Sequence, residues 1–331
     1  MSSVIEPQLS FSTVVPREHV HRSAISEVFL TDIICEKYPR FRLGVQLPRQ
    51  HSYYSEHSVA ESAVYDPLLL LECSRQASIL IAHRYVGAGM DQKFIFNTGN
   101  LRITDLDGLS VRLHPGYGIL DADIIEEKKR GDIVIGITLA IEIQLDGVRV
   151  ATMDMSIQWM PGSAWDKVRD RGRAQLDLTA STPYPLAHRV APEVVGRRSL
   201  ENVVVGEVSA DATAVDAEIV VDQHHPSLFD HPLDHLPGAV IFEAFRQTGV
   251  VAAQELFGLS PQRLVATVVR ATFLRFGELE LATRTRAKPL PPTEDGTVEF
   301  NIEMLQDDVV ITEGLVAFRR TGRLPIFGVR A

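Results

Sequence analysis

Two copies of one motif, half a chain apart, dominate the sequence. The first copy reads Asp66-Pro67-Leu68-Leu69-Leu70-Leu71-Glu72-Cys73-Ser74-Arg75-Gln76-Ala77. The second copy reads Pro237-Gly238-Ala239-Val240-Ile241-Phe242-Glu243-Ala244-Phe245-Arg246-Gln247-Thr248. The glutamate, arginine and glutamine of one copy each lie 171 residues from their counterparts in the other. A repeat of about half the chain indicates a duplicated domain rather than a solenoid, whose repeats are much shorter.

Weaker matches flank the motif and set the expected domain boundaries. His21-Arg22-Ser23 resembles Arg197-Arg198-Ser199, and His51-Ser52-Tyr53-Tyr54 resembles His225-Pro226-Ser227-Leu228-Phe229. Between the repeats, a charged run is followed by several prolines, which is typical of a linker. We therefore expect one domain over residues 18–162, a linker over 163–192 and a second domain over 193–325.

Each half shows the same order of elements. Residues Leu68–Arg84 and Ala239–Leu256 are apolar on most faces, which predicts two buried helices. Runs rich in Val, Ile and Thr follow each helix and predict antiparallel strands, with hairpin turns at Asp146-Gly147 and Asp307-Asp308. The expected strands are Asp132–Leu145, Val148–Met160, Glu278–Pro289, Thr297–Leu305 and Val309–Arg319. Without βαβ alternation, the pattern predicts an α+β fold.

Composition narrows the classes of partner. The chain has 331 residues, a net charge of −10 and two cysteines. The acidic charge disfavours nucleic acid as the main partner, and two cysteines are too few for a disulfide scaffold or a Cys-rich metal site. We see no apolar run long enough for a bilayer and no signal peptide. We expect a cytoplasmic protein that binds neither nucleic acid nor membrane.

The second motif resembles the helix start of hotdog-fold acyl-carrier-protein dehydratases. The two motifs together are more similar to the A-factor biosynthesis (AfsA-type) proteins of actinomycetes. That family has Asp-Pro-Leu-Leu…Glu-x-x-Arg-Gln in its first repeat and His-Pro-x-Leu-Phe…Asp-His-x-Pro-Gly…Glu-x-x-Arg-Gln in its second, as this chain does. The resemblance covers about residues 20–319. It implies a tandem (double) hotdog, in which a curved antiparallel sheet wraps a long central helix twice.

The resemblance also implies an activity. Proteins of this family join a β-ketoacyl group, carried on acyl carrier protein, to the hydroxyl of dihydroxyacetone phosphate. The phosphorylated ester is the precursor of γ-butyrolactone or furan-type autoregulators that control secondary metabolism. We therefore expect an acyltransferase that needs no cofactor, working as a monomer (a pseudo-dimer of its two repeats) or a homodimer.

Acyl transfer to an alcohol needs a base, an oxyanion site and cations for the phosphate. Glu72 and Glu243 lie on apolar helices, where desolvation is expected to raise the carboxyl pKa. Arg75 and Arg246 share a helix face with them, three residues on. We predict these four as the catalytic residues, with arginine binding phosphate or holding the carboxylate ionised. An ion pair within each helix is the structural alternative.

Further residues are candidates for substrate binding. Gly238 follows a proline at a helix start, where free N–H groups could polarise a carbonyl; the first repeat has Asp66-Pro67 there, which suits that role less well. The other predicted substrate-binding residues are Gln76, Gln247, His231, Asp234 and His235. The histidine cluster before the second helix suggests zinc as an alternative, but we predict no metal site. Cys73 lacks a counterpart in the second repeat and is interpreted as packing.

An acidic acyl carrier protein requires a basic docking face. The candidate arginines are Arg169, Arg171, Arg173, Arg197, Arg198, Arg319, Arg320 and Arg323. Two other functions stay open at this point: another thioester enzyme on the same fold, such as a dehydratase or thioesterase, and a non-catalytic protein that binds acyl carrier protein or the lactone.

Overall fold

The computed structural model describes residues 8–56, 63–176, 178, 185–291 and 293–321. These residues form two compact units. The first comprises Met1–Arg49, Pro67–Thr179 and Phe229–Pro232; the second comprises Gln50–Asp66, Ala180–Leu228 and Leu233–Ala331. Each unit therefore contains a short segment that the sequence places in the other repeat.

The first unit is a six-stranded antiparallel sheet with one long helix. Along its sheet the strand order is β1-β2-β4-β5-β6-β3. Its elements are β1 (Leu30–Lys37), β2 (Arg40–Leu47), α1 (Pro67–Ile81), β3 (Lys93–Ile103), β4 (Gly116–Arg130), β5 (Ile133–Leu145), β6 (Val148–Met160) and α2 (Gly162–Arg173).

The second unit repeats this topology strand for strand. Its order is β9-β12-β11-β10-β8-β7, again antiparallel. Its elements are β7 (Val205–Ala210), β8 (Val215–Ile219), α3 (Gly238–Phe257), β9 (Leu264–Phe273), β10 (Arg284–Pro289), β11 (Val298–Gln306) and β12 (Val309–Arg320). The α+β prediction is confirmed, and the chain is a double hotdog.

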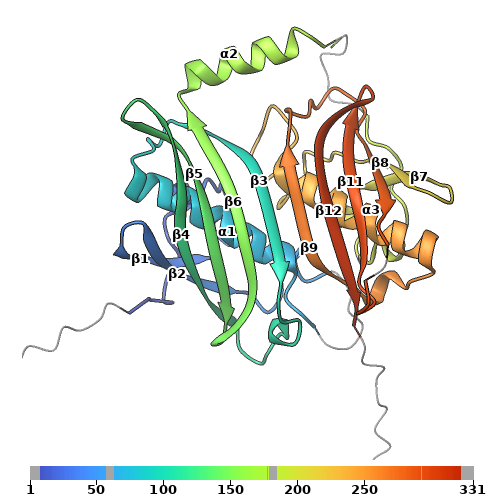
Figure 1. The fold of residues 1–331 in the computed structure, drawn as a ribbon, viewed down its shortest axis with the longest axis horizontal. Coiled ribbons are helices and arrows are strands. Elements are labelled where there is room, and N and C mark those ends of the chain that lie inside the picture. Colours follow the sequence, from blue (N-terminus) through green and yellow to red (C-terminus); the bar gives the residue numbers. More distant parts are fainter. Residues whose placement is uncertain (1–7, 57–62, 177, 179–184, 292, 322–331) are drawn as a thin grey trace, which may run out of the picture. The chain divides into compact units, whose positions relative to one another are not determined.

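The two long helices are buried because the sheet of their own unit wraps them. Helix α1 contacts β1, β3, β5 and β6, and α3 contacts all six strands of the second unit. In Figure 1 each helix lies along one face of its own sheet. Every residue of α1 except Arg75 is buried, which explains why the motif is apolar on nearly all sides.

Some predicted boundaries differ from the structure. The first helix ends at Ile81 and continues as a single π-helical turn, Ala82–Val86, that Gly87 terminates at φ 90°. The strand expected over Glu278–Pro289 begins only at Arg284, because the side chain of Gln306 bonds both backbone polar groups of Glu278. The region expected as a linker contains α2.

Both predicted hairpin turns are confirmed, because the backbone there is left-handed as a type I′ turn requires. The φ angles are 47° and 82° at Asp146-Gly147, and 48° and 60° at Asp307-Asp308.

Gly314 of β12 lies so close to the backbone of the neighbouring strand β9, and to helix α3, that a side chain has no room there. A Cβ on Gly314 would lie 1.9 Å from the carbonyl oxygen of Arg270 and 2.8 Å from the Phe245 ring. We predict that Gly314→Ala lowers the free energy of unfolding by about 1–3 kcal/mol, as overpacking does, measured by urea denaturation. Gly172→Ala is the matched control: its Cβ meets nothing within 4 Å. Equal stability of the two variants would contradict this close contact.

Candidate functional site

The carboxylate of Glu72 is enclosed by cationic and amide donors. Arg75 donates from Nε to Oε2 and from Nη2 to Oε1, both at 2.8 Å. Arg22 approaches Oε1 with Nη2 at 2.6 Å, and Gln76 donates to the same oxygen at 2.7 Å. The spacing of the motif creates this cluster, since positions i, i+3 and i+4 of a helix share one face.

The second unit builds the same cluster around Glu243. Arg197 places Nη2 2.9 Å from Oε2 and donates from Nε to Oε1 at 3.1 Å. Arg246 binds both carboxylate oxygens, and Gln247 donates to Oε1. The hydroxyl of Tyr53 adds a further hydrogen bond to Oε2 at 2.8 Å. The ion pairs of the two motifs are therefore real, and each has a second arginine.

These second arginines, Arg22 and Arg197, were missed because the repeats were aligned one residue out of step. The sequence match paired His21 with Arg197, but the structure gives Arg22 and Arg197 the same partner in their units. A short 3-10 turn and one left-handed residue precede each: His21 at φ 51° and Gly196 at φ 69°. Aligning Val20 with Val195 would have found the pair.

The two motif glutamines, Gln76 and Gln247, also form hydrogen bonds with the backbone. Each amide nitrogen donates to a carbonyl, and each amide oxygen accepts from an N–H, in the segment before the first strand. The partners are Glu27 and Phe29 for Gln76, and Asn202 and Val204 for Gln247. Each amide nitrogen thus donates to a backbone carbonyl and to the motif glutamate, so a substrate acceptor would have to replace one of these bonds.

The expectation that burial raises the pKa of the two glutamates is wrong. Desolvation does act in that direction, but two guanidinium groups outweigh it and lower the pKa of both Glu72 and Glu243 to about 2. Both carboxylates are therefore ionised at neutral pH and are weak bases. Burial raises the pKa of the Cys73 thiol well above its ordinary value, which agrees with its interpretation as packing.

The two clusters differ in how far they reach solvent. The side chain of Arg75 is 21% exposed, whereas that of Arg246 is 6% exposed and that of Glu243 is fully enclosed. Tyr53 contributes to this enclosure, and its counterpart is the smaller Ser227. Tyr53 and Ser227 occupy equivalent positions because each donates its backbone N–H to a histidine two residues earlier. His51 accepts from Tyr53 and His225 accepts from Ser227, both at 3.2 Å.

The two predicted histidines belong to different units. His231 belongs to the first unit and lies 3.3 Å from Asp230. His235 belongs to the second unit, where its Nδ1 is 2.6 Å from Asp234 and its ring contacts Phe276 edge-on at 5.3 Å.

Helix α3 begins as predicted. Its first intrahelical bonds run from the N–H groups of Val240 and Ile241 to the carbonyl of Pro237. A Cβ at Gly238 would meet the Phe273 ring at 3.6 Å, an ordinary contact. In the free protein, a small side chain would therefore fit at position 238, so glycine is not needed there for space.

The structure removes two arginines from the predicted docking face. Arg169 and Arg197 are buried, so both were wrong as members of an exposed basic surface. Arg171, Arg198, Arg319 and Arg320 are exposed. Arg323 lies outside the described residues.

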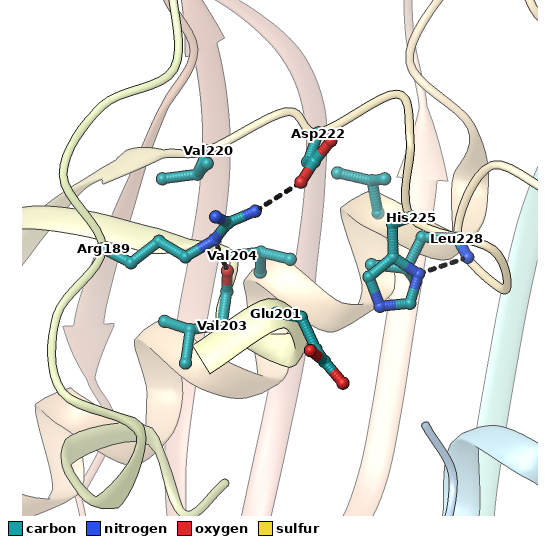
Figure 2. Close-up of a pocket in the computed structure, with 9 residues that line it drawn as sticks. Arg189, Glu201, Val203, Val204, Val220, Asp222, His225 and Leu228 are labelled. Carbon is teal, nitrogen blue, oxygen red and sulfur yellow. Dashed lines mark hydrogen bonds and ion pairs between the residues drawn. The ribbon is translucent and has the colours of Figure 1, made fainter. Parts of the chain in front are cut away.

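A narrow pocket lies elsewhere in the second unit (Figure 2). Arg189 crosses it, pairing with Asp222 at 2.8 Å and donating to the carbonyl of Val203. His225 lines the opposite part and accepts from the N–H of Leu228 at 3.0 Å. None of the predicted site residues lines this pocket, so it is not the candidate site.

Among the residues that the structure describes, no group of three or more His, Cys, Asp or Glu side chains is placed to hold a metal ion. Within the same residues, no helix is both long enough and apolar enough to cross a membrane.

The paired carboxylates predict acid lability. A carboxyl pKa that falls from 4.5 to about 2 on folding adds stability above pH 4.5, and that stability is lost as the pH falls toward 2. Glu243→Gln removes this contribution and leaves two arginines unbalanced. We expect it to cost about 3–5 kcal/mol at pH 7 and to weaken the acid dependence, measured by urea unfolding from pH 7 to 2.5.

Glu303→Gln is the control for that variant, because Glu303 is more exposed and lies 3.9 Å from Lys288. We expect the Glu303→Gln protein to lose less than about 1 kcal/mol of unfolding free energy. A Glu243→Gln protein as stable as the control at pH 7 would refute the pairing described above.

Comparison with known proteins agrees with this architecture. The family model for the A-factor biosynthesis hotdog domain matches residues 5–161 and 178–322. A Streptomyces virginiae protein named 2-oxo-3-(phosphooxy)propyl 3-oxoalkanoate synthase is 31% identical over 316 residues, which cover 93% of this chain and 98% of that protein. A Streptomyces coelicolor protein of the same name is 24% identical, covering 90% and 89% of the two chains.

A solved structure described as an oleoyl thioesterase from Lactobacillus plantarum has a TM-score of 0.50 at 12% identity, covering 86% of this chain and 96% of its own. That likeness concerns the fold. The match over both repeats shows that this chain belongs to the A-factor biosynthesis hotdog family.

Proposed function

We propose that this protein transfers a 3-oxoacyl group from a thioester on acyl carrier protein to the primary hydroxyl of dihydroxyacetone phosphate. The support is the 31% identical relative from Streptomyces virginiae, which aligns over nearly its whole length. The name of that relative describes an ester: its alcohol part is the skeleton of dihydroxyacetone phosphate, and its acid part is a 3-oxoalkanoate. The ester is the phosphorylated precursor of a γ-butyrolactone or furan-type signal.

The reaction exchanges one bond to the acyl carbon for another. The acceptor oxygen attacks the thioester carbonyl, the C–O bond forms, the C–S bond breaks, and the hydroxyl proton ends on the thiol. The protein must hold the phosphate, stabilise the oxyanion and move that proton.

We assign phosphate binding to Arg75. It is the motif arginine with the greater solvent exposure, and guanidinium binds phosphate through two parallel hydrogen bonds. Glu72 and Gln76 then orient Arg75 rather than accept a proton, because guanidinium and amide donors already occupy both oxygens of Glu72. In the second unit, Glu243, Arg246 and Gln247 have the same orienting role in a more enclosed cluster.

The backbone N–H groups of Gly238 and Ala239 precede the first intrahelical bonds of α3. Within the second unit, they are our candidates for polarising a carbonyl. His235 and Asp234 lie just before this helix start, and His231 lies in the first unit, where it interacts electrostatically with His21. We retain all three as substrate-binding candidates.

The test is turnover of a defined substrate pair. Purified protein is mixed with a 3-oxoacyl thioester of acyl carrier protein and dihydroxyacetone phosphate, and free thiol and the ester are followed by colorimetry and mass spectrometry. We expect thiol release and ester formation in equal amounts, and little of either with unphosphorylated dihydroxyacetone. Thiol release that is independent of the acceptor would identify a thioesterase instead. Binding without turnover would identify a non-catalytic protein.

The equivalent arginines provide a matched pair of variants. Arg75→Lys keeps the charge but loses the planar fork, so we predict a 10–150-fold higher KM for dihydroxyacetone phosphate, the value of one charge-assisted bond of about 1.5–3 kcal/mol. Arg246→Lys should mainly lower thermal stability, because Arg246 is the more enclosed. If the two variants change KM equally, the assignment of phosphate to Arg75 is wrong.

A further inference from the structure

A histidine occupies a backbone position that favours glycine. His21 follows the 3-10 turn Arg17–Val20 in the left-handed conformation, at φ 51°. Its counterpart in the second unit is Gly196, at φ 69°. Left-handed backbone is uncommon for residues other than glycine, and such positions cluster at functional sites. Only the first unit has an imidazole at this position, so the contacts of its ring indicate what the histidine does there.

The ring of His21 is held by a second histidine. Its Nε2 lies 2.9 Å from Nε2 of His83, and Nδ1 of His83 lies 2.9 Å from the carbonyl oxygen of Ala88. A carbonyl only accepts, so Nδ1 of His83 carries a proton and Nε2 of neutral His83 is the acceptor. His21 must then donate from Nε2, which leaves the lone pair on its Nδ1.

The structure around His83 is itself unusual. His83 lies in the π-helical turn Ala82–Val86 that interrupts the end of α1. Single π turns inside helices occur frequently at functional sites. In the second unit α3 runs to Phe257 as regular α-helix, so this turn and the histidine pair are features of the first unit.

Aromatic and cationic groups surround the pair. The Phe94 ring lies edge-on to His21 at 4.9 Å and contacts His83 at 5.1 Å. Arg75 donates from Nη2 to the carbonyl of Val20, the residue before His21. The positive charges of Arg75 and Lys93 act on His21 electrostatically. The arginine assigned to phosphate is therefore bonded to the residue next to His21 and acts on its imidazole electrostatically.

We propose that Nδ1 of His21 is the general base for the acceptor hydroxyl, with His83 as the residue that positions it. This inference rests on the proposed function, and it identifies the group that accepts the proton of the acceptor hydroxyl. Nδ1 takes the hydroxyl proton as the acceptor oxygen attacks the thioester carbonyl. When the C–S bond breaks, the imidazolium returns that proton to the departing sulfur, so the base is regenerated and no other reactant is needed.

The electrostatics of the site fit this role. Burial and the neighbouring cations lower the pKa of His21 to about 3, so the imidazole is neutral at physiological pH and its lone pair is available. Burial is the larger cause and persists when the acceptor binds, but a phosphate dianion beside Arg75 offsets the field of the cations and makes the imidazole a stronger base than in the free protein. The basicity of the imidazole therefore rises when the phosphorylated acceptor is bound.

The experiment uses His21→Gly, because glycine suits φ 51° and the fold should persist. We expect kcat for ester formation to fall by about 10²–10⁴-fold with KM for dihydroxyacetone phosphate changed less than threefold, and added imidazole to restore part of kcat. Asp308→Gly is the control, since Asp308 also has a left-handed backbone (φ 60°) but an exposed side chain. Normal kcat in a folded His21→Gly protein would overturn the proposal.

A second measurement does not depend on turnover. Nitrogen NMR of the full-length protein should show His21 protonated at Nε2 and bare at Nδ1, and dihydroxyacetone phosphate should shift the Nδ1 resonance. His83→Phe should remove the tautomer preference. An Nδ1 signal unmoved by the acceptor overturns the role of His21 even if ester forms. A shifted signal without any ester supports His21 as a contact of the acceptor and refutes the transferase activity.

Discussion

The structure depends on one electrostatic balance that occurs twice: a carboxylate inside an apolar helix, held ionised by two guanidinium groups. One arginine comes from the same helix and the other from the segment before the first strand, so each ion cluster ties the central helix to the edge of its sheet. A buried charge without partners would cost more than the pair contributes. The Glu-x-x-Arg-Gln motif therefore has a structural role in each unit, independent of any role in the reaction.

Duplication allows the two copies of this cluster to diverge. In the second unit Tyr53 covers Glu243, and the arginines are enclosed. In the first unit Arg75 keeps partial access to solvent, and a histidine pair lies beside it. The same motif therefore stabilises one unit and, in our proposal, also binds substrate in the other. The identity of the motifs conceals this difference, which arises from residues outside them.

The sequence predicted those elements whose residues act locally. Periodicity identified both helices, and Asp146-Gly147 identified its hairpin because a type I′ turn needs these residue types. Partners contributed by distant segments were harder to recognise: the flanking sequence match contains Arg22 and Arg197, but one residue out of register, and only the fold shows that each binds a glutamate. The same limit explains the pKa error, because desolvation of a helix face can be read from sequence but the second guanidinium cannot. The late start of β10 depends on one side chain, Gln306, from a neighbouring strand.

The segments exchanged between the repeats constrain the order in which the protein can fold during synthesis. Residues Gln50–Asp66 belong to the second unit and carry Tyr53, while Phe229–Pro232 belong to the first and carry Asp230, which accepts hydrogen bonds from the backbone of Ser23 and Ala24. The first unit cannot be completed on the ribosome until more than two thirds of the chain has been translated. Its early strands are therefore made long before the last segment of their unit.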